Sequence, residues 1–332
     1  MMSVKTGALV RCHPAMALVA AALLCSACVS TSTTPKTTEK PTAPPATSTQ
    51  KPAAPARGGT TPAAGTEAAA AKVPTITAAD GTKIAYEVSG TGPALLMLHG
   101  GGQSRKSWAE RGYVDRLAKK FTVIRLDLRG SGDSGRPDTP AGYALDKVVA
   151  DILAVADAAG AKRFQLYGFG HGATIGRYLA AQSDRVISAV LVGMEMGPAV
   201  SGPVKEALTS MRAKWQPMLE AQKAGTLDIK KLSPGDRDAW EHGVALSAIA
   251  LGALLDYPPV QPADIKAPTL WLVGAADASG MENVKQFEGK LAGTKVTFKP
   301  LAGLSYTDSF ARIDPVLAEV DPFLASTATP AS

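Results

Sequence analysis

Three glycines at alternate positions constrain the fold of this 332-residue chain more than any other feature. They are Gly168, Gly170 and Gly172, and they come directly after the hydrophobic segment 164–167 and before a segment with helical character. A short hydrophobic segment of this kind is consistent with a buried strand, and glycines permit a sharp turn with close backbone approach. The stretch therefore predicts a strand-to-helix turn with Gly170 at its tip, and this tip residue has no side chain.

Other apolar runs also end in loops rich in glycine or polar residues. The run 94–98 leads into His99-Gly100-Gly101-Gly102-Gln103, and the run 121–126 leads into a loop from Asp127 to Ser134. Strand-like runs that alternate with helical segments predict a doubly wound, mostly parallel sheet with its functional loops at the carboxyl ends of the strands. The eight expected strands lie near residues 73–79, 83–88, 94–98, 121–126, 163–167, 186–192, 269–273 and 295–300.

These loops together resemble the motifs of the α/β-hydrolase superfamily. The turn at 168–172 resembles G-x-S-x-G, in which the central serine is the nucleophile, and the loop from His99 resembles the HGGG-type loop that supplies an oxyanion N–H. The loop from Asp127 is similar to D-x-R-G-x-G-x-S, and the strand before Asp277 is similar to the one that carries the family's acid. The resemblance covers residues 73–326. It implies the α/β-hydrolase fold, with a helical cap near residues 198–262 above the pocket.

The resemblance places Gly170 at the nucleophile position, Asp277 at the acid position and Tyr306 at the histidine position. The loop before Tyr306 is similar to the family's Pro/Ala-Gly-x-x-His loop, with tyrosine in place of histidine. A glycine offers no attacking atom, and a tyrosine with an ordinary pKa near ~10 is a poor base at neutral pH. The sequence therefore predicts a protein of this fold without Ser-His-Asp hydrolysis. We expect it to bind a small apolar or ester-like ligand, or a partner, under the cap.

An active hydrolase or lyase of an ester-like substrate is the alternative, with a displaced nucleophile or base. Its candidate residues are His99, Ser104, His171 and Tyr306. The family's histidine equivalent to His99 usually has a structural role. The resemblance implies oxyanion-hole N–H groups from Gly101 and His171, with His99, Ser104 and Trp108 as further binding residues. No metal and no cofactor are expected.

The first 72 residues predict export and a tether. Residues 1–27 combine positive charges with an apolar run too short to span a bilayer, as is typical of a signal peptide. The end of this segment, Leu24-Cys25-Ser26-Ala27-Cys28, resembles a bacterial lipobox in which Cys28 is lipidated, so we expect a lipoprotein anchored in the cell envelope. An ordinary secretory signal, giving a secreted or periplasmic protein, is the alternative. The Thr/Pro/Ala-rich residues 28–72 predict a disordered tether, and residues 327–332 a short tail.

Composition excludes two classes of function. All three cysteines lie in or at the edge of the expected signal peptide, so cleavage before Cys28 would leave the folded part without a thiol for redox or zinc-thiolate chemistry. The net charge is +6, and part of it belongs to the signal and tether. Because the remainder contains no long basic run, we expect no nucleic-acid partner. The sequence leaves the oligomeric state open.

Overall fold

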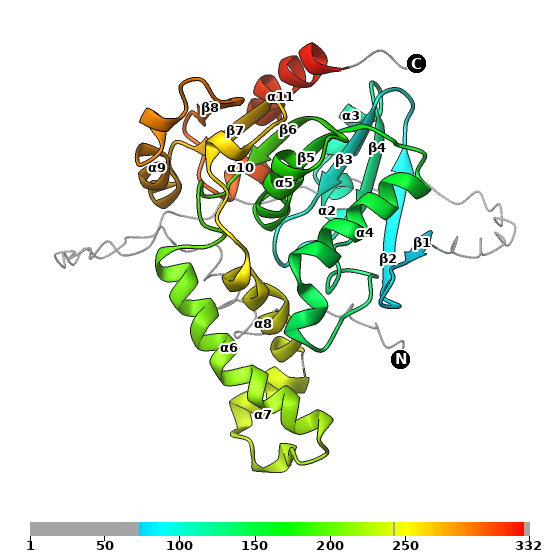
Figure 1. Cartoon of the computed structure of the whole chain (residues 1–332), viewed down its shortest axis with the longest axis vertical. Helices are drawn as coiled ribbons and strands as arrows, with labels where there is room; N and C mark the ends of the chain where they lie inside the picture. Colours follow the sequence, from blue (N-terminus) through cyan, green and yellow to red (C-terminus); the bar gives the residue numbers. More distant parts are fainter. Residues whose placement is uncertain (1–72, 242, 329–332) are drawn as a thin grey trace, which may run out of the picture. The chain divides into compact units, whose positions relative to one another are not determined.

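The computed structural model describes residues 73–241 and 243–328 of the chain (Figure 1). The signal peptide 1–27, the lipidation site Cys28, the tether 28–72 and most of the tail 327–332 lie outside the described residues, and these four stay predictions. Within the described ranges, no helix is both long enough and apolar enough to cross a membrane.

A single eight-stranded sheet contains all the strands of the described residues, in the order β1-β2-β4-β3-β5-β6-β7-β8. β2 pairs antiparallel with β1 and with β4, and every other neighbouring pair is parallel. The doubly wound, mostly parallel sheet expected from the sequence is therefore confirmed. The strands are β1 Thr75–Thr77, β2 Lys83–Ser89, β3 Ala94–Leu98, β4 Thr122–Leu126, β5 Phe164–Phe169, β6 Val186–Val192, β7 Thr269–Gly274 and β8 Val296–Leu301.

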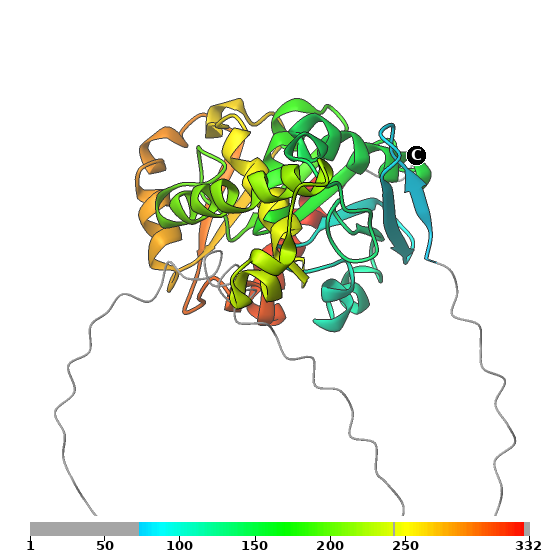
Figure 2. The ribbon, with the colours of Figure 1, turned by 90° about the horizontal axis from the view of Figure 1, so that it is seen from below.

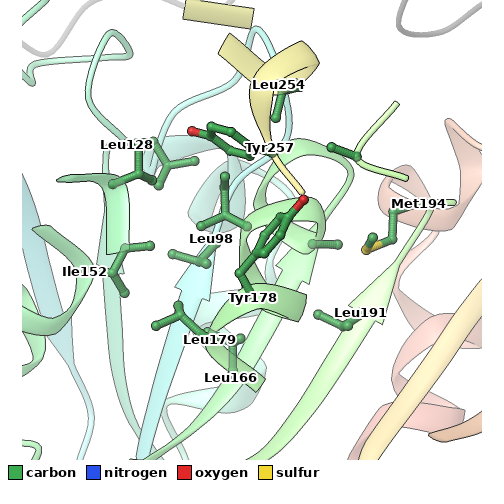
Figure 3. Close-up of a cluster of buried hydrophobic side chains, with 14 of the residues drawn as sticks. Leu98, Leu128, Ile152, Leu166, Tyr178, Leu179, Leu191, Met194, Leu254 and Tyr257 are labelled. Atoms are coloured by element: carbon green, nitrogen blue, oxygen red, sulfur yellow. The ribbon is translucent and has the colours of Figure 1, made fainter. Parts of the chain in front are cut away.

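Helices cover both faces of the sheet because its central strands are apolar on both sides, as in β5 and β7, where every residue is buried. One apolar cluster includes buried residues of α4 and α5, and Figure 3 shows part of it around Leu98, Leu166 and Leu191. A second cluster, on the other face, includes residues of α3, α10 and α11. The helices outside the cap are α2 Lys106–Glu110, α3 Tyr113–Leu117, α4 Leu145–Ala158, α5 His171–Gln182, α9 Ala278–Lys285, α10 Asp308–Ala311 and α11 Ile313–Thr327, with 3-10 turns η1 Pro140–Tyr143 and η5 Glu288–Lys290.

The chain between β6 and β7 is helical, as the sequence predicts for residues near 198–262. α6 packs against α8, and α7 also packs against α8. Figure 1 shows the three helices grouped on one side of the sheet, and in the view of Figure 2 they lie in front of it. The elements of this insertion are α6 Gly202–Lys223, η2 Ile229–Lys231, α7 Pro234–Glu241, α8 Val244–Gly252, η3 Ala253–Asp256 and η4 Pro262–Asp264.

Candidate functional site

Gly170 is the single residue between the end of β5 and the start of α5, as the sequence predicts. Its backbone has φ 50° and ψ −114°, in the region that residues with a side chain rarely adopt. The turn is fixed on both sides, because the Gly170 N–H donates to the carbonyl of Val192 at 2.9 Å and the Gly170 carbonyl accepts from the N–H of Thr174 at 2.9 Å. A residue with a Cβ would carry strain of about 1–3 kcal/mol in this conformation, and glycine does not.

The side chain of Tyr306 lies over the tip of this turn. A Cβ built on Gly170 would overlap the phenolic oxygen of Tyr306 and would lie 3.5 Å from its Cζ. The ring of Tyr306 packs beside Phe169, with ring centroids 5.2 Å apart. Gly193, just after β6, also makes room for the ring, because a Cβ there would come within 3.1 Å of Tyr306 Cε2. The space of a side chain on residue 170 is therefore filled by a tyrosine from a loop distant in sequence.

The Tyr306 hydroxyl faces the site as a hydrogen-bond donor. Among the described residues its oxygen has no hydrogen-bond partner, and Tyr306 is one of the residues that line the cavity. Burial raises the pKa of Tyr306 well above its ordinary value, and the negative charge of Asp277 raises it further. The phenol therefore stays protonated at neutral pH, and it can donate to a ligand but cannot serve as a general base.

Asp277 lies at the carboxyl end of β7, where it caps the N-terminus of α9. Its Oδ1 accepts a hydrogen bond from the N–H of Gly280 at 3.0 Å. Burial raises the pKa of Asp277, while the bond from Gly280 acts in the opposite direction. Asp277 therefore acts as a helix cap in this structure, and within residues 73–241 and 243–328 no hydrogen bond joins its carboxylate to a histidine.

A cavity with a volume of about 190 Å³ brings the triad positions together. Gly170, His171, Asp277 and Tyr306 all line it. Its polar wall also includes Glu195 and residues with hydroxyl side chains from α5, α9 and the loop after β8, namely Thr174, Ser279, Ser305 and Thr307. The aliphatic part of the wall comes from Met194, Ala199, Val200, Val204 and Leu254. The insertion thus supplies part of the cavity wall through Val204 on α6 and Leu254 on η3.

Glu195 is a lining residue that the sequence analysis missed. It follows β6 at the carboxyl edge of the sheet, where functional residues of such sheets gather. Its Oε2 accepts a hydrogen bond from the Ser201 hydroxyl at 2.6 Å. The Nη1 of Arg177 donates to the main-chain carbonyl of Glu195 at 3.1 Å. The position of Glu195 after a predicted strand could have identified it from the sequence. Together with Asp277, Glu195 gives the site two carboxylates.

His171 is the first residue of α5, so its N–H is one of the donors that a helix N-terminus leaves without an intrahelical partner. Its ring is partly buried, and Nδ1 has no hydrogen-bond partner among the described residues. Burial, with a smaller contribution from His99, lowers the pKa of His171 to about 4. The imidazole is therefore neutral at pH 7 and a weak base.

His99 is completely buried and both of its ring nitrogens are used. Nε2 accepts from the N–H of Leu128 at 3.1 Å, so Nδ1 carries the proton and donates to the carbonyl of Gly100 at 2.9 Å. Burial lowers the pKa of His99. The ring joins the loop after β3 to the loop after β4 and does not line the cavity, so the structure gives it a positioning role.

The other expected binding residues lie outside the cavity wall. Trp108 is completely buried in an aromatic cluster, with ring centroids 5.1 Å from Tyr113 and 5.1 Å from Phe310, which corrects the expectation that it contacts a ligand. The hydroxyl of Ser104 accepts from the N–H of Lys106 at 3.3 Å, at the start of α2. Gly101 follows Gly100, whose Cα is 3.8 Å from a Cβ built on Gly170, so this loop does approach the turn.

The loop after β4 is held by a buried charge network. Arg105 is completely buried and pairs with Asp127, and it also contacts Glu87 at 3.0 Å and Asp133 at 2.9 Å. The hydroxyl of Ser134 donates to the Asp127 carbonyl at 2.7 Å and accepts from a β2 N–H. These groups bind one another, so the loop supports the sheet edge.

No cluster of three or more His, Cys, Asp or Glu side chains that could hold a metal ion is found in the ranges 73–241 and 243–328.

Comparison with known proteins agrees with the architecture. A family model described as the alpha/beta hydrolase fold matches residues 93–227. The enol-lactonase from Burkholderia xenovorans LB400 superposes with a TM-score of 0.58 over 76% of this chain and 100% of its own, at 24% sequence identity. A structure of the bottromycin epimerase in complex with bottromycin A2 superposes with a TM-score of 0.57 over 77% of this chain and 99% of its own, at 25% identity. The chain has the α/β-hydrolase fold.

Curated relatives match about a third of this chain. A fluoroacetate dehalogenase from Burkholderia sp is 36% identical over 105 residues, which is 30% of this chain and 34% of that protein. A soluble epoxide hydrolase from Corynebacterium sp. (strain C12) is 30% identical over 121 residues, which is 36% of this chain and 41% of that protein. The chain thus spans about a third to two fifths of the length of these relatives. The matches support the α/β-hydrolase superfamily.

Proposed function

We propose that this protein uses the α/β-hydrolase fold to bind a small ligand and does not carry out Ser-His-Asp hydrolysis. The ligand would occupy the cavity between the carboxyl edge of the sheet and the cap helices. One observation carries the proposal, namely that the Tyr306 hydroxyl occupies the place of a side chain on residue 170. Gly170 has no side chain that could attack a substrate, and the Tyr306 hydroxyl occupies the space that a serine side chain would need. Hydrolysis with a serine nucleophile at this turn is therefore not expected.

The surroundings of Tyr306 support this proposal. Gly170 and Gly193 both leave space that the ring fills, and Phe169 packs beside it. The phenol stays protonated, so the histidine position holds a donor where hydrolysis needs a base. An oxyanion hole that survives here could polarise a ligand carbonyl, but it could not supply an attacking atom.

The similar proteins include more than one kind of chemistry. The printed names are a dehalogenase, an epoxide hydrolase and an enol-lactonase, but also an epimerase. Because the same fold supports such different reactions, the fold by itself does not argue for hydrolysis. The proposed function is therefore based on the residues that line the cavity.

We further propose that the protein is exported and anchored to a membrane through lipid on Cys28. The support is the lipobox-like sequence before Cys28 and the Thr/Pro/Ala-rich segment that follows it. Several acyl chains on one residue would anchor the protein stably. Cys28→Ala should abolish incorporation of labelled palmitate and release the protein from membranes. Continued palmitate labelling of this variant would refute the anchor.

The absence of serine chemistry can be tested with a fluorophosphonate probe, which reacts with activated serines. We expect no labelling of the purified protein under conditions that label an active serine esterase. Labelling that maps to any serine of the chain would contradict the proposal. The adduct should then be located by mass spectrometry, with Ser279 and Ser305 the first to inspect because both line the cavity.

Catalysis by a displaced group is the second candidate function, because His171 lines the cavity. Of the four residues that the sequence offered for this role, only His171 and Tyr306 are part of the cavity wall. The pKa of His171, about 4, makes the imidazole available but weakly basic at pH 7. Turnover of an ester or epoxide that disappears in His171→Ala would establish this alternative.

A further inference from the structure

We propose that the cavity selects a small ligand with a cationic head, such as a primary ammonium group, on an apolar body. This inference rests on the proposed ligand-binding function and names the class of ligand. It follows from the charges on the cavity wall and from where those charges lie.

Two carboxylates from different strands line the cavity. Asp277 follows β7, and Glu195 follows β6. Neither carboxylate pairs with a lysine or arginine side chain within the described residues: Asp277 accepts from a main-chain N–H and Glu195 from the Ser201 hydroxyl. Two partly buried carboxylates that form no salt bridge with a side chain of the described residues favour a ligand that brings a positive charge itself.

The wall contains no compensating cation. None of its residues is a lysine or an arginine, and His171 is neutral at pH 7. Arg177 does not line the cavity, and it donates to the main-chain carbonyl of Glu195 at 3.1 Å and to the hydroxyl of Tyr178 at 3.3 Å. Its positive charge also attracts the Glu195 carboxylate. Counting Arg177 together with the two carboxylates still leaves the site with net negative charge. The two carboxylates would repel an anionic ligand, and no lysine or arginine of the wall would bind it. The site should therefore discriminate against anions.

The remaining wall fits a short apolar body. Met194, Ala199, Val200, Val204 and Leu254 present aliphatic surface, and the Tyr306 hydroxyl, which has no partner, adds one donor. Small-ligand sites of this kind combine mostly apolar walls with a few convergent polar groups that set orientation. The cavity thus matches an amine with a short hydrocarbon chain better than a carboxylic acid of the same length.

Three probes of equal chain length test the inference: hexylammonium, 1-hexanol and hexanoate. Their dissociation constants would be measured at pH 7 by ligand-observed NMR titration of the full chain carrying Cys28→Ala. We expect hexylammonium to bind about tenfold more tightly than hexanol, and hexanoate to bind most weakly. Added salt should reduce the preference for hexylammonium, because counterions screen the carboxylates.

Four variants locate the effect. Glu195→Gln and Asp277→Asn keep shape and hydrogen-bond acceptance but remove charge, so each should reduce the preference for hexylammonium over hexanol severalfold. Glu206→Gln is the matched control, because Glu206 is an exposed residue of α6 that does not line the cavity. It should leave the preference unchanged. Val204→Trp fills the cavity and should abolish binding of all three probes.

The outcomes separate the inference from the proposed function. Equal binding of the three probes, or preference for hexanoate, would overturn the cationic selectivity and leave ligand binding in place. Absence of binding by all three probes, or binding that persists in Val204→Trp, would overturn both. Circular dichroism of each variant establishes that the chain is folded before its binding is compared.

Discussion

Two loop regions at the carboxyl edge of the same sheet differ in how many of their polar groups have hydrogen-bond or ion-pair partners. In the loop after β4, Asp127 is completely buried and is bound by Arg105 and by the N–H of Asp133 at 2.8 Å. Around the turn after β5, the Tyr306 hydroxyl has no partner in the described part of the chain, and a glycine stands where a side chain would be. The first region supports the fold, and the second leaves its groups open to a cavity.

This difference separates the groups that hold the fold from the groups that face the cavity. The network around Asp127 stabilises the sheet edge whatever happens at residue 170, because its groups bind one another. The turn itself keeps its backbone hydrogen bonds to Val192 and Thr174. At the tip of the turn, the Tyr306 hydroxyl lies where a side chain on residue 170 would be. The residues that stabilise the sheet edge are therefore different from the residues that line the cavity. Substitutions in the first set should change stability, and substitutions in the second set should change ligand binding.

The largest effect is expected from Arg105→Met, which leaves Asp127 buried without its ion-pair partner. Breaking a buried pair on one side costs about 3–5 kcal/mol of unfolding free energy. The control is Lys106→Met on the neighbouring residue, because the Lys106 side chain is 57% exposed and its contact with Asp133 is 3.4 Å long. An exposed pair contributes less than about 1 kcal/mol. Urea unfolding measures both, and equal costs would contradict the assigned role of the network.

Gly170→Ala should have the next largest effect, because it combines backbone strain with overlap of the Tyr306 hydroxyl. Strain alone costs about 1–3 kcal/mol. Gly160→Ala is the matched control: its φ of 75° is also positive, but a Cβ there meets nothing within 4 Å. In a Tyr306→Ala background the overlap is gone, so a double-mutant cycle should give a coupling of about 0.5–3 kcal/mol. Additive costs would show that Tyr306 does not occupy this space.

Acidification should destabilise the protein through His171. Its pKa of about 4 in the folded state lies below the ordinary value of 6.5, so the unfolded chain binds the proton more tightly. The stabilisation is complete above about pH 6.5 and is lost as the pH falls toward 4. Because the ring is partly exposed, we expect the loss to be about 1–3 kcal/mol.

The control for this prediction is His171→Gln. The variant keeps the buried His99, whose lowered pKa acts in the same direction, so the difference between the two unfolding curves isolates His171. Urea unfolding at pH 7.0, 5.5 and 4.5 should show a steeper loss in the wild type. If the unfolding free energy falls equally with pH in both proteins, the pH dependence arises from groups other than His171.

Much of the fold was predictable because it depends on local pattern. The expected strand near 121–126 is observed at Thr122–Leu126, and the expected strand near 269–273 is observed at Thr269–Gly274. The position of Gly170 at a strand-to-helix turn followed from the three glycines. These features depend on residues close together in the chain, which is why the sequence carries them.

The arrangement within the site was harder to predict, because it depends on packing between distant segments. That Tyr306 fills the space above Gly170 requires the loop after β8 to meet the turn after β5. Trp108 was expected to contact a ligand, but the short helix α2 turns it into the aromatic core. Glu195 could have been found from its place after β6, since loops at that edge gather functional residues.

The central claim is that the Tyr306 hydroxyl in place of a nucleophile leaves no triad hydrolysis. Turnover of p-nitrophenyl acetate by the wild type and by Gly170→Ser, Tyr306→His and the double variant tests it most directly. We predict background rates for the wild type and both single variants, because each lacks a nucleophile, a base or both. The double variant removes the overlap and offers Asp277 a histidine, so any gain should appear there alone. Wild-type turnover that survives Gly170→Ala and disappears in His171→Ala would contradict the account.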